Sequence, residues 1–115
     1  MSKLSIRWEQ HGYVLTLFLS GSLDSDTSDQ FDQYMTELIK VGHRWLVVDL
    51  AGLEYVSSAG VGVLVGSVNE LQENNGDLRL SAVPSKISRV LEMLFLLDLF
   101  QIFPDQAHAV ASYNG

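Results

Sequence analysis

The sequence predicts a small single-domain α/β fold, a mixed sheet of four or five strands covered by about four helices. The short apolar run Leu46–Leu50 is typical of a buried strand. Two adjacent serines, Ser57 and Ser58, then precede apolar residues at helical spacing. From Leu46 onward, predicted strands and helices alternate. This alternation predicts parallel strands joined by right-handed crossover helices.

Length and composition predict one domain that spans residues 1–115. Of the 115 residues, 47% are hydrophobic and 18% are charged, which suits one apolar core. A net charge of −7 argues against nucleic acids and anionic membrane surfaces as partners. The chain has no cysteine, which excludes disulfides and thiolate metal sites.

The sequence also predicts where the protein is found. The first residues, Met1–Ser5, do not resemble a signal peptide, and no apolar run reaches the roughly 18 residues that a membrane span needs. We therefore expect a cytoplasmic protein.

The first elements of the chain are predicted to be two strands and a helix. Alternation predicts a strand at Leu4–Trp8, Gln10–Gly12 suggests a turn, and Tyr13–Leu19 is apolar enough for a central strand that Gly21 would end. The polar cluster at residues 24–28 is typical of a helix start. The apolar face of that helix would be formed by Phe31, Met35, Leu38 and Ile39, with Gly42 just past its end.

The middle of the chain predicts a strand, a connection and a second helix. The strand Leu46–Leu50 would be followed by a connection over Ala51–Val56, and the helix would end near Asn74–Gly76. Its apolar face would comprise Val61, Leu64, Val65, Val68 and Leu71.

The last third of the chain predicts two further strands and two helices. Leu78–Val83 reads as a strand, and Pro84 would be the first residue, N1, of the next helix. That helix would bury Ile87, Val90, Leu91 and Leu94. A short strand at Phe100–Phe103 and a terminal helix starting at Pro104 and Asp105 complete the prediction.

The serine pair suits a helix start in two ways. A serine hydroxyl can accept a hydrogen bond from an orphan backbone N–H, so we expect at least one of the two to cap the helix. The free N–H groups and the helix dipole also favour an anion there. A phosphate on such a serine would therefore leave the helix intact.

The stretch DLAGLEYVSSAGVGVLVG, residues 49–66, resembles the signature of the STAS domain in the anti-sigma-factor antagonist family. Three further segments resemble family motifs in the same order: Gly21–Asp24, Gly76–Leu80 and Leu99–Phe103. The resemblance covers nearly the whole chain and implies a STAS-like fold.

The resemblance also implies a function without chemistry or a cofactor of its own. A member of this family binds an anti-sigma factor with serine kinase activity and so frees a sigma factor; phosphorylation ends the binding and a phosphatase restores it. In the register of Gly60, the phosphorylated serine is Ser58, and Ser57 stands where the best-studied members have Asp. The partner-binding residues implied are Asp24, Ser57, Ser58, Ala59 and Gly60, so we expect Asp24 to lie close to Ser58.

Two other functions stay open at this stage. The chain could be an unphosphorylated STAS subunit of a transporter or of a stressosome-like complex, an alternative that Ser57, in place of the usual Asp, leaves open. It could also be a small-molecule sensor.

Other chemistry is less well supported by the residues. Gly60 and Gly62 suggest a dinucleotide loop, but Val65 stands where the third glycine is needed; these glycines more simply allow close helix packing. Ser58, Asp98 and His108 follow the chain order of a hydrolase triad, yet the residue two before Ser58 is not glycine. The histidines, His11, His43 and His108, show no metal-ligand spacing.

Two residues allow more than one interpretation. Asp24 is either a turn or N-cap residue or part of a functional edge. Phe95, where the family often has Gly, lies in the apolar run Met93–Phe100, which predicts either core packing or an exposed patch that meets a partner.

Overall fold

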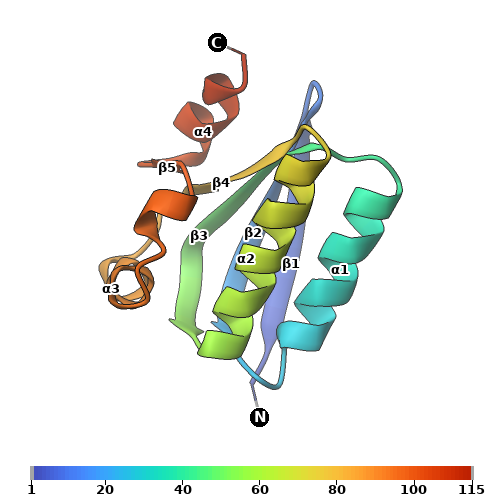
Figure 1. Ribbon diagram of the computed structural model, residues 1–115. Helices are drawn as coiled ribbons and strands as arrows, with labels where there is room; N and C mark the ends of the chain where they lie inside the picture. The colour runs from blue at the N-terminus through green and yellow to red at the C-terminus, as the bar shows by residue number, and fades with distance from the viewer. Residues whose placement is uncertain (1, 115) are drawn as a thin grey trace.

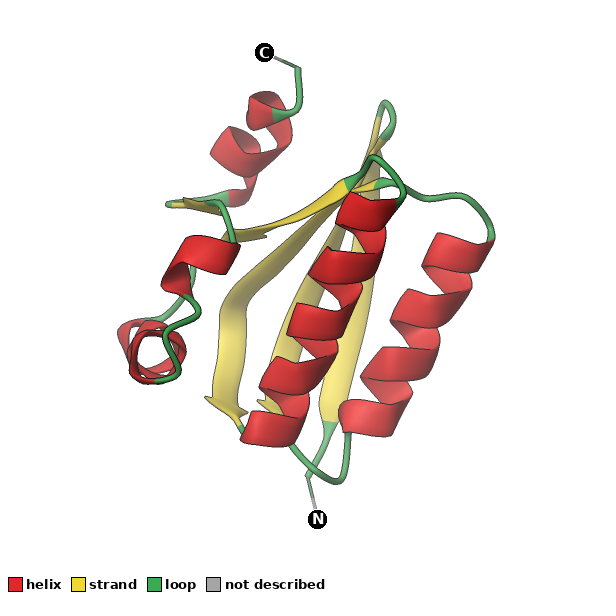
Figure 2. Cartoon of the chain, in the orientation of Figure 1, coloured by secondary structure: helices red, strands yellow, loops and turns green. Residues whose placement is uncertain are grey.

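The protein is a five-stranded sheet with helices on both faces, as seen in a computed structural model that describes residues 2–114 (Figures 1 and 2). The strands lie in the order β1 (Leu4–His11), β2 (Val14–Leu23), β3 (Trp45–Val56), β4 (Asp77–Ser81) and β5 (Ile102–Phe103). The helices are α1 (Ser28–Lys40), α2 (Ser58–Glu73), α3 (Ser85–Met93) and α4 (Gln106–Ser112), and a 3₁₀ turn, η1, spans Leu97–Leu99.

The sheet is mixed, as the sequence predicts. β1 pairs with β2 in the antiparallel direction, and the pairs β2–β3, β3–β4 and β4–β5 are all parallel. Strands that follow one another in a constant direction across the sheet, with right-handed crossovers, place their helices on one face. Accordingly α1 and α2 lie side by side over the same face of the sheet (Figure 1).

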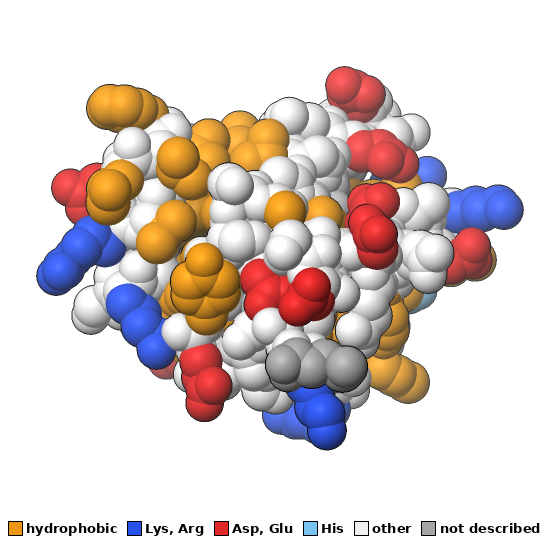
Figure 3. Space-filling model, turned by 90° about the horizontal axis from the view of Figure 1, so that it is seen from below, with side chains coloured by type: hydrophobic (Ala, Val, Ile, Leu, Met, Phe, Trp, Pro, Cys, Tyr) orange, Lys and Arg blue, Asp and Glu red, His pale blue; other side chains and the backbone are white. Residues whose placement is uncertain are grey.

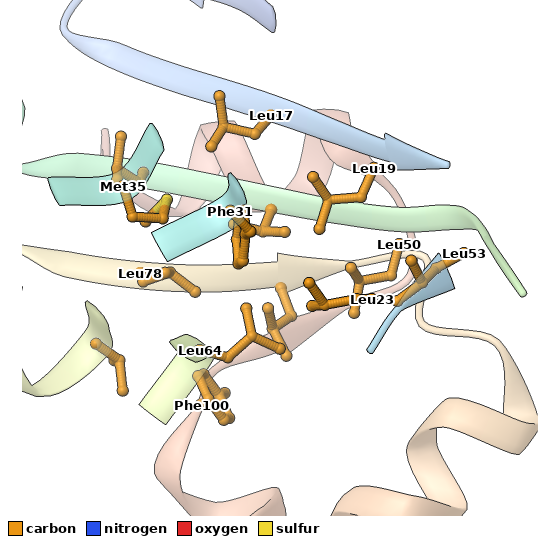
Figure 4. Packing of buried hydrophobic residues seen from close by; sticks show 14 of the residues in the cluster. Leu17, Leu19, Leu23, Phe31, Met35, Leu50, Leu53, Leu64, Leu78 and Phe100 are labelled. Atoms are coloured by element: carbon orange, nitrogen blue, oxygen red, sulfur yellow. The ribbon is translucent and has the colours of Figure 1, made fainter. Parts of the chain in front are cut away.

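The main core fills the space between the sheet and helices α1, α2 and α3. Leu17 and Leu19 of β2 face Phe31 and Met35 of α1 across this layer (Figure 4), and all four side chains are buried. Alternate residues of the strands point to the opposite face. There, α4 covers a smaller cluster that includes Val14, Val47 and Ala109.

The central strands are longer than the sequence predicts. The connection predicted at Ala51–Val56 is wrong, because β3 continues to Val56, where it pairs with Leu23 of β2. Gly21 does not end β2. Its φ of +96° accompanies a register shift, and a side chain on it would collide with the backbone of Lys3.

Smaller boundary differences occur elsewhere. β4 ends at Ser81, before the predicted Val83, and Pro84 occupies the N-cap of α3, one residue before the position predicted. Gly42 lies just past the end of α1 with φ of +107°, as predicted.

Candidate functional site

The parallel pairing of β2 and β3 brings two helix starts to the same edge of the sheet. Leu23 is the last residue of β2 and pairs with Val56, the last residue of β3. Beyond this pair, the backbone N–H of Ser57 donates to the carbonyl of Leu23 at 2.9 Å. Asp24 and Ser58 thus lie at the same edge, one and two residues past the Leu23–Val56 pair.

Asp24 shapes the turn that leads into α1. Its Oδ1 accepts from the backbone N–H of Asp26 at 2.9 Å, and its backbone carbonyl accepts from the N–H of Ser28 at 2.7 Å. The N-cap position belongs to Thr27, so Asp24 is a turn aspartate. Two hydrogen bonds to its carboxylate, one from the Ser2 hydroxyl and one from the Asp26 N–H, lower the pKa of Asp24. Its carboxylate is therefore charged at neutral pH.

Thr27 supports this turn and was not singled out by the sequence. Its side chain is buried, and its hydroxyl donates to the Ser22 carbonyl at 2.8 Å while accepting from the Asp24 N–H at 3.0 Å. The only signal for it in the sequence is the polar cluster at residues 24–28. Thr27 fixes the position of Asp24 relative to the end of β2.

The two serines at the start of α2 differ in their hydrogen bonding. Ser57 is the N-cap, and its hydroxyl accepts from the backbone N–H of Gly60 at 3.3 Å. Ser58 is the first residue of the helix and is exposed. No hydrogen bond joins the Ser58 hydroxyl to another residue within the described range 2–114. Capping is thus assigned to Ser57, whereas Ser58 is exposed at the start of the helix.

Gly60 is required by close packing at this edge, whereas Gly62 is not. A Cβ on Gly60 would lie 2.5 Å from the carbonyl oxygen of Leu23, so a side chain would push α2 away from β2. A Cβ on Gly62 would meet nothing within 4 Å. The prediction that both glycines allow close packing is correct for Gly60 and wrong for Gly62.

This edge can accept an anion but does not assemble a hydrolase triad. The first turn of α2 points backbone N–H groups at the Ser58 region. His108 belongs to α4, at the far end of the sheet from the start of α2 (Figure 1), and its Nδ1 pairs with Asp105 at 2.7 Å. Across residues 2–114, no three His, Asp or Glu side chains are grouped closely enough to hold a metal ion. Over the same range, no helix has the length and apolar character that crossing a membrane requires.

The face of the molecule that carries this edge is chemically divided. Figure 3 views the molecule from the side at which α2 begins, and acidic side chains lie near the middle of that face. Hydrophobic side chains gather toward the side where α3 lies. Large hydrophobic residues that are exposed include Tyr55, next to the last residue of β3, and Met93, Leu94 and Phe95 at the end of α3.

The apolar run Met93–Phe100 combines both interpretations that the sequence left open. Leu96, Leu97 and Leu99 pack against the main core, and Phe100 is buried in it. Met93, Leu94 and Phe95 are exposed instead.

Comparison with known proteins gives a consistent result. A family model described as the STAS domain matches residues 5–109. The anti-sigma F factor antagonist of Paenibacillus polymyxa is 31% identical over 108 residues, which cover 93% of this chain and 92% of that protein. The anti-sigma-B factor antagonist of Staphylococcus aureus is 30% identical over 84 residues, covering 73% and 78%. A crystal structure of an anti-sigma factor antagonist from Mycobacterium paratuberculosis superposes with a TM-score of 0.89 at 21% identity, covering 98% and 96%.

Proposed function

This chain belongs to the STAS domain family, and we propose that it acts as an anti-sigma-factor antagonist. Two relatives of about its own length carry that name and align with most of its length. As an antagonist, it binds an anti-sigma factor and so releases a sigma factor. The binding needs no metal, cofactor or catalytic group in this chain.

The partner-binding surface proposed is the edge formed by Asp24, Ser57, Ser58, Ala59 and Gly60. Ser58 and Ala59 are exposed on the first turn of α2, and the charged carboxylate of Asp24 lies at the same edge. Buried Gly60 keeps this turn close to the end of β2. A rigid surface of this kind binds with a small entropic cost, because its backbone is already ordered.

A kinase activity of the partner is proposed to switch the binding off by phosphorylating Ser58, and a phosphatase to restore it. The observation that carries this proposal is the division between the two serines: the Ser57 hydroxyl caps α2, whereas the Ser58 hydroxyl is exposed. A phosphate adds about −1.5 to −2 charges at neutral pH. At a helix N-terminus the fold tolerates that charge. Inside a protein interface the same charge would have to be desolvated, so binding would fall while the fold survives.

Phosphorylation with the kinase-type anti-sigma factors of the same genome tests this proposal. The wild type, Ser58→Ala and Ser57→Ala are each incubated with kinase and ATP, and the peptide spanning both serines is analysed by mass spectrometry. We expect phosphate on Ser58 in the wild type and in Ser57→Ala, and none in Ser58→Ala, which should bind the partner constitutively.

Each other result has a distinct meaning. Phosphate on Ser57 alone would contradict the choice of Ser58. Binding without phosphate on either serine would favour an unphosphorylated subunit of a larger complex, a function consistent with Ser57 at the position of the usual Asp. Absence of binding to every kinase-type anti-sigma factor would contradict the antagonist function itself.

Thermal melts test the sensor alternative separately. If this chain needs no ligand, melting curves with EDTA, Mg²⁺ or ATP should coincide with the curve in buffer alone. A ligand that binds only the folded state raises the melting temperature. A rise of several degrees with Mg²⁺ or ATP would therefore favour the sensor.

A further inference from the structure

Three helices of this protein end in the same hydrogen-bonded motif, with a left-handed residue just past the C-cap. That residue is Gly42 after α1, Asn75 after α2 and Phe95 after α3, with φ of +107°, +66° and +59°. In each case the residue that follows donates its backbone N–H to the carbonyl of the third-last residue of the helix. These bonds run from His43 to Leu38, from Gly76 to Leu71 and from Leu96 to Leu91, at 2.7–3.0 Å.

Phe95 is the exception among the three left-handed residues. Glycine has no Cβ to clash in this conformation, and asparagine tolerates it, whereas a bulky aromatic residue is strained there. The motif itself uses only the backbone of Phe95, whose N–H donates to the Glu92 carbonyl at 3.0 Å. The side chain is 93% exposed, so the strain is not offset by burial within the chain.

Two neighbours extend this exposed surface. Met93 is 72% and Leu94 is 43% exposed, and we refer to Met93, Leu94 and Phe95 together as the α3 patch. The patch is not a continuation of the core, since Leu96 turns back onto the main core. Contiguous exposed apolar side chains of this kind mark protein interaction sites.

The helix that carries the α3 patch and the start of α2 both lie toward the lower end of the molecule in Figure 1. When the molecule is viewed from the side where α2 begins, hydrophobic side chains occupy the α3 side of that face and lead toward its middle (Figure 3). We infer that the α3 patch is an apolar anchor for the anti-sigma factor that binds the Ser58 edge. This inference rests on the proposed function and extends its interface to a region where this chain has Phe in place of Gly.

Charge favours such a partner over a second copy of this chain. Glu92 and Asp98 flank Phe95, and with Leu97 they line a shallow depression beside its ring. A twofold contact through Phe95 would bring these carboxylates against their own copies, in a protein of net charge −7. The cations of α3, Lys86 and Arg89, lie earlier in the helix. The partner fitted to this surface has an apolar pocket for an aromatic ring and a basic rim.

Binding measurements on two Phe95 variants test the inference. Phe95→Gly and Phe95→Asn reproduce the residues that end α1 and α2, so both should fold at least as well as the wild type. We expect each to weaken binding of the kinase-type anti-sigma factor about 10- to 100-fold in Kd by calorimetry, as for a central aromatic anchor. Val41→Ser is the matched control: it removes a 69% exposed side chain at the C-cap of α1, at the opposite end of the fold, and should leave Kd unchanged.

The outcomes separate this inference from the proposed function. If the Phe95 variants bind as tightly as the wild type while Ser58 phosphorylation still abolishes binding, the antagonist function holds and the α3 patch is not an anchor. If the wild type itself binds no such partner, both fail. Sedimentation of the wild type and Phe95→Asn at high concentration tests whether a second copy of this chain covers the α3 patch instead. If the wild type dimerises, the variant does not, and partner binding is unchanged, then the patch is a dimer contact and not an anchor for the anti-sigma factor.

Discussion

The start of α2 and the end of α3 differ in what determines their residues. At the start of α2, the fold itself accounts for the sequence: Ser57 caps the helix and Gly60 packs beneath the Leu23 carbonyl. At the end of α3, Phe95 is in a strained backbone conformation and its ring contacts solvent. The comparison teaches that a residue can oppose the stability of its own chain, and such a residue is informative about what the chain binds.

Gly60→Ala should produce the largest effect, because it breaks the packing at the start of α2. The added Cβ would lie 2.5 Å from a backbone oxygen that belongs to a central strand and cannot easily move. We expect a loss of about 3 kcal/mol in the free energy of unfolding, at the upper end of overpacking costs. Urea denaturation measures it, and Gly62→Ala is the control.

The control variant, Gly62→Ala, should be more stable than the wild type. A Cβ at Gly62 meets nothing within 4 Å, and alanine is favoured over glycine inside a helix by about 1 kcal/mol. If Gly62→Ala destabilises as much as Gly60→Ala, the contrast drawn between the two glycines is wrong.

Ser57→Ala should destabilise the protein more than Ser58→Ala, because only Ser57 caps α2. Loss of the Ser57 cap should cost about 0.5–2 kcal/mol. Ser58→Ala should change stability by less than about 0.5 kcal/mol, as at an ordinary exposed position. Thermal denaturation of both variants at neutral pH is sufficient, and equal losses would mean that Ser58 also supports the helix start.

Phe95→Gly should stabilise the protein by about 1 kcal/mol, since it removes the steric cost of a side chain in the left-handed region. Phe95→Asn should also stabilise the protein, but by less. An increase in unfolding free energy together with a decrease in partner affinity would sharpen the comparison most. A destabilised Phe95→Gly would show instead that the ring supports α3.

Asp24→Asn tests a smaller, pH-dependent effect at the Ser58 edge. The pKa of Asp24 is lowered by hydrogen bonds from Ser2 and Asp26, so the charged form stabilises the fold above the unfolded pKa of about 3.9. This contribution is lost as the pH falls through the lower folded pKa. The stability difference between the wild type and Asp24→Asn should therefore shrink below about pH 4. Asp32→Asn, at an exposed position of α1, serves as the control for the removal of one negative charge.

The sequence alone was sufficient for the fold class and for most of the Ser58 edge. Periodicity identified the elements, and their alternation from Leu46 onward implied parallel strands, because a crossover helix allows few other arrangements. The same reasoning brought Asp24 and Ser58 to one edge, since both follow central strands. Hydroxyls at positions 57 and 58 were enough to predict a capped helix start.

Only the tertiary structure distinguishes residues that look alike in the sequence. Gly60 and Gly62 have the same local preferences, and only the position of the Leu23 carbonyl distinguishes them. The run Met93–Phe100 is apolar except at Asp98, so its periodicity could not separate core from surface. The turn at Phe95 does so, because it sends Leu96 inward and leaves the α3 patch outside. Local propensity acts over a few residues, whereas steric contact between distant segments exists only once the chain has folded.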